Sequence, residues 1–209
     1  TSWMMNKLIN NKGGLHNRVT HQIKLSPFTL GECEEFLKAK NFTMDRFEIA
    51  QFYMVFGGIP YYLKLLDKGE SLAQNVDRLL FSEDGELRNE FHNLYHALFR
   101  NSEKYIAIVE VLAQKKKGIT RNTLIKELSV ESSGGVSKAL DDLENCGFIR
   151  RYSPFGKKTK DELIQLVDFY TLFYFRFLAK RAKGRRNQWL QIQGKPEYNS
   201  WCGYAFEML

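Results

Sequence analysis

The sequence has few cysteines and no long apolar run. Its three cysteines, Cys33, Cys146 and Cys202, are widely spaced and include no C-x-x-C pair. This spacing excludes a cysteine-based zinc site and a disulfide scaffold and is typical of a reducing compartment, so we expect a cytoplasmic protein. No apolar stretch approaches the roughly 20 residues that a membrane-spanning helix needs, and the first residues do not resemble a signal peptide. We therefore expect no membrane partner.

Several common catalytic motifs are also missing. The sequence contains no G-x-x-x-x-G-K-[ST], no G-x-G-x-x-G, no H-E-x-x-H and no G-x-S-x-G, so these 209 residues encode no loop of the kind that cradles phosphates. Among the four histidines, His92 and His96 have the i, i+4 spacing that can hold a metal on a helix. No third ligand accompanies them, and we predict no metal site.

The composition indicates a folded protein with an anionic partner. Apolar residues make up 44% of the sequence and aromatic residues 14%, as expected for one large or two small domains with packed cores. The net charge is +7, and between Arg100 and Leu190 there are 19 Lys and Arg residues but only 10 Asp and Glu residues. This basic half indicates an anionic partner, although an ordinary solvated surface would give the same counts.

The stretch 105–168 has the pattern of a winged helix-turn-helix. Helical patterns cover residues 103–118, 119–128 and 134–148, and strand patterns cover 148–153 and 162–168. Thr120 is a good N-cap for the second helix, and Gly147 is placed to end the third. Three short helices followed by a β-hairpin with a basic tip predict a mainly α fold with a small β wing.

The residues before this stretch predict a helical region that follows a single strand. Residues 19–25 alternate apolar and polar side chains, which is a strand signal. A lone strand is unstable in water, so we expect its partners to lie outside this chain. Helices are expected at 30–40, 44–56 (with Thr43 as N-cap), 61–69, 71–81 and 86–100.

The residues after Asp168 predict one long helix and a loop. Residues 169–186 form a helical pattern with a dense aromatic face and a basic end. Residues 188–201 contain the turn residues Gly194 and Pro196 and predict a loop. A further helical pattern starts in 203–209.

Three segments, taken in order, resemble a known family. They are SWMMNKLINNKGGLHNRVTHQIKLSPFTLGE at 2–32, GGIPYYLKLL at 57–66 and WCGYAFE at 201–207, with the winged-helix pattern between the last two. In this order they resemble the C-terminal two-thirds of prokaryotic AAA-type P-loop ATPases of the archaeal-type group, which has relatives in Bacteroidetes. The resemblance implies that the phosphate-binding loop and the Mg²⁺-binding acid precede this sequence. ATP and Mg²⁺ would then be cofactors of the complete protein, with none expected in this fragment.

The resemblance also implies a domain organisation. Residues 1–27 would end a nucleotide-binding domain, 28–100 would form a helical lid, 101–184 a winged-helix domain and 185–209 the start of a C-terminal domain. Such a fragment would not hydrolyse ATP alone, because nothing in it holds the phosphates and Mg²⁺. Glu207 resembles the first acidic residue of a nuclease-like core whose other metal ligands would lie beyond this chain.

Carried over by position, the resemblance implies two sites. Arg18 occupies the place of an arginine finger, whose planar fork neutralises charge on a transferring phosphoryl group and which would act within an oligomer. Gly57, Gly58 and Pro60 match a lid motif whose proline packs on the adenine. Glycines there allow close approach of the backbone. A surface arginine and a simple helix break are the structural alternatives.

The winged-helix pattern suggests a second kind of ligand. The basic residues suited to phosphate contacts are Lys138, Lys157, Lys158, Lys160, Lys180 and Arg181. The recognition-helix pattern also carries Asp141, Asp142 and Glu144, which would repel phosphates if they faced the groove. DNA contact and docking on protein therefore both stay open. A freestanding winged-helix transcription regulator is the alternative to an ATPase fragment, and a module that binds an acidic protein is a third.

Overall fold

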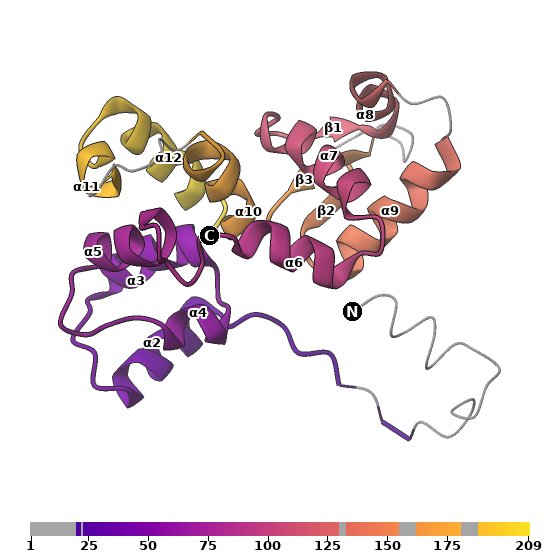
Figure 1. The fold of residues 1–209 in the computed structure, drawn as a ribbon. Coiled ribbons are helices and arrows are strands. Elements are labelled where there is room, and N and C mark those ends of the chain that lie inside the picture. Colours follow the sequence, from indigo (N-terminus) through magenta and orange to yellow (C-terminus); the bar gives the residue numbers. More distant parts are fainter. Residues whose placement is uncertain (1–19, 22, 130–132, 155–161, 181–187) are drawn as a thin grey trace. The chain divides into compact units, whose positions relative to one another are not determined.

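The computed structural model describes residues 20–21, 23–129, 133–154, 162–180 and 188–209 (Figure 1). These residues are mainly helical and include a three-stranded antiparallel sheet, as the sequence predicts. They form two compact units. We call them the sheet-containing unit, which is His92–Asp168 with the described residues up to Leu25, and the helical unit, which is Ser26–Phe91 with Phe169–Leu209.

This division differs from the predicted domain boundaries at the C-terminal side. The resemblance implies a winged-helix domain at 101–184 and the start of a C-terminal domain at 185–209. In the structure, all described residues from Phe169 onward belong with Ser26–Phe91. The sheet-containing unit is therefore inserted, in sequence, between two segments of the helical unit.

The sheet of the sheet-containing unit consists of β1 (Ile119–Thr120), β2 (Ile149–Tyr152) and β3 (Leu163–Leu166). The strands lie in the order β1-β3-β2, and both pairs are antiparallel. Strands β2 and β3 confirm the two predicted strand patterns. Strand β1 was not predicted, because two residues are too few to show an alternation of apolar and polar side chains.

Three helices pack with this sheet: α7 (Ser102–Ala113), α8 (Arg121–Leu128) and α9 (Ser133–Asn145). Helix α7 contacts β3 and α9 contacts β2 (Figure 1). Thr120 caps α8 by accepting a hydrogen bond from the Thr123 N–H, and Gly147 follows α9 with φ +80°, both as predicted. The buried apolar side chains of the three helices include Ile108, Val109, Leu112, Leu124, Val136, Leu140 and Leu143.

The helical unit contains α-helices from both of its sequence segments. They are α2 (Leu30–Ala39), α3 (Arg46–Phe56), α4 (Pro60–Lys64), α5 (Leu72–Val76), α10 (Phe169–Phe173), α11 (Gln188–Ile192) and α12 (Pro196–Phe206). Two π-helical turns, η2 (Asp77–Phe81) and η4 (Tyr174–Leu178), follow α5 and α10 directly. Helix α6 (Glu90–Leu98) begins in the helical unit and continues into the sheet-containing unit. No helix in the described part of the chain has the length and apolar character that a bilayer crossing requires.

Capping boxes start three of these helices. Thr29 caps α2, and Ser71 caps α5. Helix α3 is capped by Asp45 and not by Thr43 as predicted. Asp45 accepts a hydrogen bond from the Glu48 N–H, and the Glu48 side chain accepts one from the Asp45 N–H. This reciprocal pair satisfies two N–H groups of the first turn, which explains why the helix starts there.

The strand predicted at 19–25 is absent from its described residues. Thr20, His21 and Ile23–Leu25 lie outside helix and strand. Ile23 is 83% exposed and Leu25 is 89% exposed. The described residues of this stretch therefore show no burial that matches the alternation.

An aromatic core joins the two segments of the helical unit. Phe173 of α10 lies 5.0–6.5 Å, between ring centroids, from Phe81, Phe177, Trp189 and Trp201. Such pairs contribute about 0.5–1.5 kcal/mol each beyond the burial of their area. The loop predicted at 188–201 is therefore wrong: Trp189 and Trp201 are buried core residues of α11 and α12.

A buried carboxylate also holds the C-terminal segment. Asp77, at the start of η2, is 6% exposed. It accepts hydrogen bonds from the backbone N–H groups of Trp189 (2.8 Å) and Leu190 (3.0 Å). These N–H groups belong to the first turn of α11, where they have no partner within the helix and where negative charge is favourable.

We expect Asp77→Ala to destabilise the helical unit by about 2 kcal/mol, because the substitution leaves two backbone donors of α11 without their acceptor. Asp77→Asn keeps one oxygen acceptor and should cost less. The measurement is urea unfolding followed by circular dichroism and tryptophan fluorescence. Asp84→Ala, in the exposed turn after η2, is the matched control and should change stability by less than about 0.5 kcal/mol. Equal losses for Asp77→Ala and Asp84→Ala would contradict this account.

Candidate functional site

The GGIP segment at 57–60 connects α3 to α4 by a close backbone contact. Gly57 has φ +64° and donates its N–H to the Tyr53 carbonyl (2.8 Å), which ends α3. The Phe28 N–H donates to the Gly58 carbonyl at 2.7 Å. A Cβ atom on Gly58 would lie 2.7 Å from the Phe28 carbonyl carbon and 2.8 Å from its nitrogen. Glycine is therefore required at position 58 by the approach of Phe28.

A side chain reinforces the same contact. The Tyr53 hydroxyl donates to the Phe28 carbonyl at 2.8 Å. Desolvation by burial raises the pKa of Tyr53, and the nearby Cys33 and Glu32 raise it further, so the hydroxyl remains a donor. Phe28 thus has both its N–H and its carbonyl bonded to residues around the end of α3. Sequence reasoning missed Phe28, because nothing in the sequence indicates which backbone approaches Gly58.

Pro60, two residues after Gly58, is exposed. It is the first residue of α4, where its missing N–H leaves no donor unpaired. The neighbouring Tyr61 is 54% exposed. Phe28 lies just after Ser26, with which the helical unit begins. The Phe28–Gly58 contact therefore holds an exposed proline near the point where the chain enters the helical unit.

The acidic residues of α9 are paired with other side chains. Arg151 of β2 forms ion pairs with Asp141 (2.7 Å) and Glu144 (3.1 Å). The Tyr105 hydroxyl donates to Asp142 at 2.8 Å. Burial, followed by this hydrogen bond, raises the pKa of Tyr105. The repulsion that these carboxylates would exert on phosphates is thus reduced by partners that the sequence pattern did not reveal.

The N-terminal half of α9 is basic. Lys138 is exposed, and Arg121 donates from Nε and a terminal nitrogen to the Ser137 hydroxyl at 3.1 and 2.9 Å. The Lys104 ammonium lies so close to Gly135 that a Cβ atom there would overlap it. Three cations therefore surround the first turns of the helix, which already favour negative charge.

The other predicted nucleic-acid contacts belong to the helical unit or lie outside the described residues. Lys180 is exposed and follows η4 in the helical unit, whereas Lys138 belongs to the sheet-containing unit. The remaining candidates, Lys157, Lys158, Lys160 and Arg181, lie outside the described residues.

The remaining candidates are Arg18, Glu207 and the histidine pair His92 and His96. Arg18 lies outside the described residues. Glu207 is the exposed C-cap of α12. His92 and His96 are exposed, with ring centroids 6.4 Å apart. Within the described ranges, no group of three His, Cys, Asp or Glu side chains is placed to hold a metal ion.

Comparisons of the chain with protein-family models, with curated proteins and with solved structures found no match. Two features of the described residues are the ones that indicate a function. One is the exposed Pro60 beside the fixed Gly58, and the other is the basic end of α9.

We expect Gly58→Ala to destabilise the helical unit by at least about 2 kcal/mol, because the new methyl group must displace the Phe28 backbone and break its hydrogen bond. The matched control is Gly203→Ala in the same unit. Gly203 lies within α12, and a Cβ atom added to it would have no neighbouring atom within 4 Å, so alanine there should be neutral or stabilising by up to about 1 kcal/mol. Thermal and urea unfolding measure both. A Gly58→Ala protein as stable as Gly203→Ala would show that the Phe28–Gly58 contact does not constrain the fold.

Proposed function

We propose that the chain is the lid and winged-helix part of an AAA-type P-loop ATPase. The helical unit is the lid, which closes on ATP and Mg²⁺ held by a nucleotide-binding domain that precedes it. The observation that supports this most is the GGIP segment, where Pro60 is exposed on the first turn of α4. A lid must present its ligand-contacting residues toward the domain that precedes it, and Phe28, bonded to Gly58, is near the start of the helical unit.

In this proposal each predicted site residue has a separate role. Pro60 provides a flat apolar surface for the adenine, and Gly57 and Gly58 set the backbone that carries it. Arg18 reaches the γ-phosphate in a neighbouring subunit and stabilises its charge during transfer. Oligomerisation is therefore part of the proposal.

The sheet-containing unit is the winged helix in this proposal. Its elements follow the order α7-β1-α8-α9-β2-β3 with an antiparallel β2–β3 pair, which is typical of that fold. We further propose that α9 contacts DNA through the phosphate backbone. The supporting observation is the pairing of Asp141 and Glu144 with Arg151, which leaves Lys138 exposed on a helix whose acidic side chains have internal partners.

A freestanding winged-helix regulator is the second candidate function. The basic first turns of α9 favour it equally, because they need no ATPase. In a regulator, unlike in the ATPase lid, Pro60 would contact no nucleotide. Docking of the same surface on an acidic protein is the third reading, and the DNA measurement below separates it from the others.

We expect Mg²⁺-dependent ATP hydrolysis from the complete protein encoded by the reading frame that contains this chain. Pro60→Ala should raise KM for ATP about fivefold, because it removes roughly 1 kcal/mol of apolar contact with the adenine. Arg18→Ala should lower kcat by about 10³ with little change in KM. A steady-state assay measures both effects.

The control for the first substitution is Pro196→Ala, which changes the first-turn proline of α12 in the same unit and should leave both constants unchanged. The 209-residue chain alone should show no hydrolysis. Equal KM effects at Pro60 and Pro196 would contradict the lid role. A complete protein without ATPase activity would favour the regulator.

We expect the chain to bind duplex DNA with an affinity that falls steeply between 50 and 200 mM salt, as phosphate contacts require. Lys138→Gln should weaken binding and reduce the salt slope by about 1. Lys195→Gln removes the same charge from an exposed position in the helical unit and should have a smaller effect. Fluorescence anisotropy with a labelled duplex measures these quantities. Binding that is absent, or equally weakened by the two substitutions, would exclude α9 as a DNA surface and favour docking on protein.

A further inference from the structure

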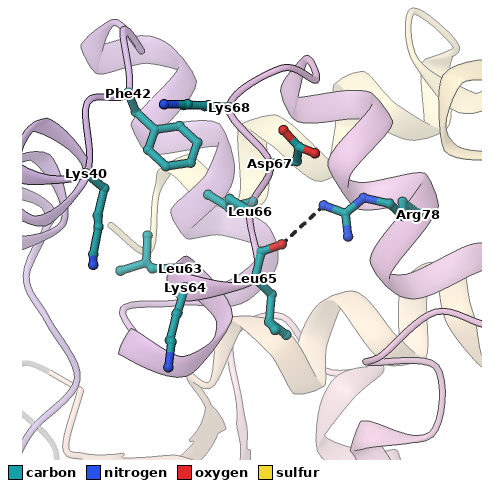
Figure 2. Close-up of a pocket in the computed structure, with 9 residues that line it drawn as sticks. All are labelled: Lys40, Phe42, Leu63, Lys64, Leu65, Leu66, Asp67, Lys68 and Arg78. Atoms are coloured by element: carbon teal, nitrogen blue, oxygen red, sulfur yellow. Dashed lines mark hydrogen bonds between the residues drawn. The ribbon is translucent and has the colours of Figure 1, made fainter.

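The helical unit contains an open pocket of about 620 Å³ that no motif indicated. Figure 2 shows it between the end of α2, the end of α4 and the turn that follows α4. Its lining residues are Lys40, Phe42, Leu63, Lys64, Leu65, Leu66, Asp67, Lys68 and Arg78. All of them belong to the first segment of the helical unit. The volume lies within the range of small-molecule sites.

The lining carries an excess of positive charge. Among the residues that the structure describes, no carboxylate forms an ion pair with Lys40, Lys64 or Lys68. Figure 2 shows Lys40 and Lys64 extending in the same direction from two separate elements. Asp67 is the acidic residue of the lining, and one of its carboxylate oxygens already accepts a hydrogen bond from the Gly69 N–H. The lining therefore contains three lysines without an ion pair among the described residues and one carboxylate.

The fourth cation of the lining has a structural role. Arg78 donates to Glu70 (2.8 Å), to the Asn75 side-chain oxygen (2.8 Å) and to the Leu65 carbonyl (3.2 Å). Its charge is thus balanced by Glu70, and its position is fixed. The three lysines are the groups that remain to bind a ligand.

The turn that forms one wall is held rigidly. Asn75, which is 2% exposed, accepts from the Asp67 N–H (2.7 Å) and donates to the carbonyls of Asp67, Glu70 and Ser71 at 2.9–3.2 Å. A buried amide that satisfies so many backbone groups removes the freedom of a non-helical segment. Lys68 is therefore carried by a wall that is already ordered, which lowers the entropy lost on binding.

The pocket also has apolar surface. Phe42, Leu63 and Leu66 contribute apolar side chains between the lysines (Figure 2). A bare inorganic anion would use the ammonium groups alone. A ligand with an apolar or aromatic group would use these walls as well.

We propose that this pocket binds a phosphate ester of a small organic molecule, with the phosphate on Lys40 and Lys64 and the organic group against Phe42 and Leu66. A phosphate dianion matches two or three ammonium groups, and an apolar group matches the walls. This site is independent of the proposed ATPase function, because it uses neither Pro60 nor Mg²⁺. Lysines scattered on an ordinary solvated surface are the competing interpretation, and they would show no preference for an aromatic ester.

The test is an NMR titration of the ¹⁵N-labelled 209-residue chain, without Mg²⁺, with phenyl phosphate, inorganic phosphate and uncharged benzyl alcohol. We expect saturable shifts at the amides of 40–42 and 63–68. Phenyl phosphate should bind at least about fivefold more tightly than inorganic phosphate, because a phenyl ring adds apolar burial. Benzyl alcohol should bind more weakly than phenyl phosphate, because it lacks the charge.

Two matched triple variants separate the pocket from general surface charge. Lys40→Gln/Lys64→Gln/Lys68→Gln should weaken phenyl phosphate binding at least about tenfold. Lys24→Gln/Lys126→Gln/Lys195→Gln removes the same charge from exposed positions outside the pocket and should weaken it less than twofold. Phe42→Leu should reduce the preference for phenyl phosphate over inorganic phosphate without changing the affinity for inorganic phosphate. All replaced lysines are exposed, so the variants should fold, and circular dichroism checks this.

Three results would overturn the proposal. They are equal weakening by the two triple variants, shifts that do not saturate, and shifts confined to residues 57–61. The last result would point to the lid site instead, so the two proposals can fail separately. A pocket that binds phenyl phosphate in a protein without ATPase activity would leave this inference standing while the lid proposal fails.

Discussion

The helical unit depends on a buried carboxylate that accepts two hydrogen bonds. Asp77 lies 112 residues from Trp189 in sequence and binds the first N–H groups of α11. Burying a charge is costly unless it is hydrogen-bonded, and a helix start provides both donors and a favourable dipole. The contact places Trp189 beside Phe81 and Phe173, so the aromatic core is complete only when the second segment has docked. Since the sheet-containing unit lies between the two segments in sequence, the helical unit must close a long loop to form, and this polar anchor helps to offset that entropy.

Contacts between residues of different elements also shape the two surfaces considered for function. Pro60 is exposed two residues after Gly58, which has no side chain and admits the Phe28 backbone, and the Tyr53 hydroxyl donates to the Phe28 carbonyl. The acidic residues of α9 do not dominate its surface because Arg151, one strand away, binds two of them. In both places a contact between elements decides what is presented to solvent. The identity of the presented residue alone does not decide it.

Features that depend on local sequence could be predicted, and features that depend on contacts between distant residues could not. Helices α7–α9 and strands β2 and β3 were predicted because their apolar periodicity is local, and Thr120 and Gly147 mark helix ends by local chemistry. The region 188–201 was mistaken for a loop because Gly194 and Pro196 are turn residues. In the structure Gly194 has φ +79° between α11 and α12, and Pro196 begins α12, so both signals mark a junction between helices that Asp77 and the aromatic core stabilise. The change from α5 to η2 at Asp77 had no sequence signal. For the sites, the glycines and Pro60 could be named in advance, whereas Phe28, Arg151 and the lysine pocket depend on tertiary contacts.

The sheet-containing unit lies in sequence between the two segments of the helical unit, so the chain must cross between the units. The chain passes between the units between Leu25 and Ser26, within α6, and between Asp168 and Phe169, and a contact stands beside each of the last two crossings. On the helical side, Phe91 stacks on Tyr174 with ring centroids 3.8 Å apart. On the other side, the Phe148 carbonyl accepts the N–H groups of Val167 and Asp168 at 2.9 and 3.2 Å. Each of these contacts lies within one unit, and together they order the chain up to the two crossings. If the helical unit is the proposed lid, the crossings within α6 and between Asp168 and Phe169 are where a hinge-type change would have to occur.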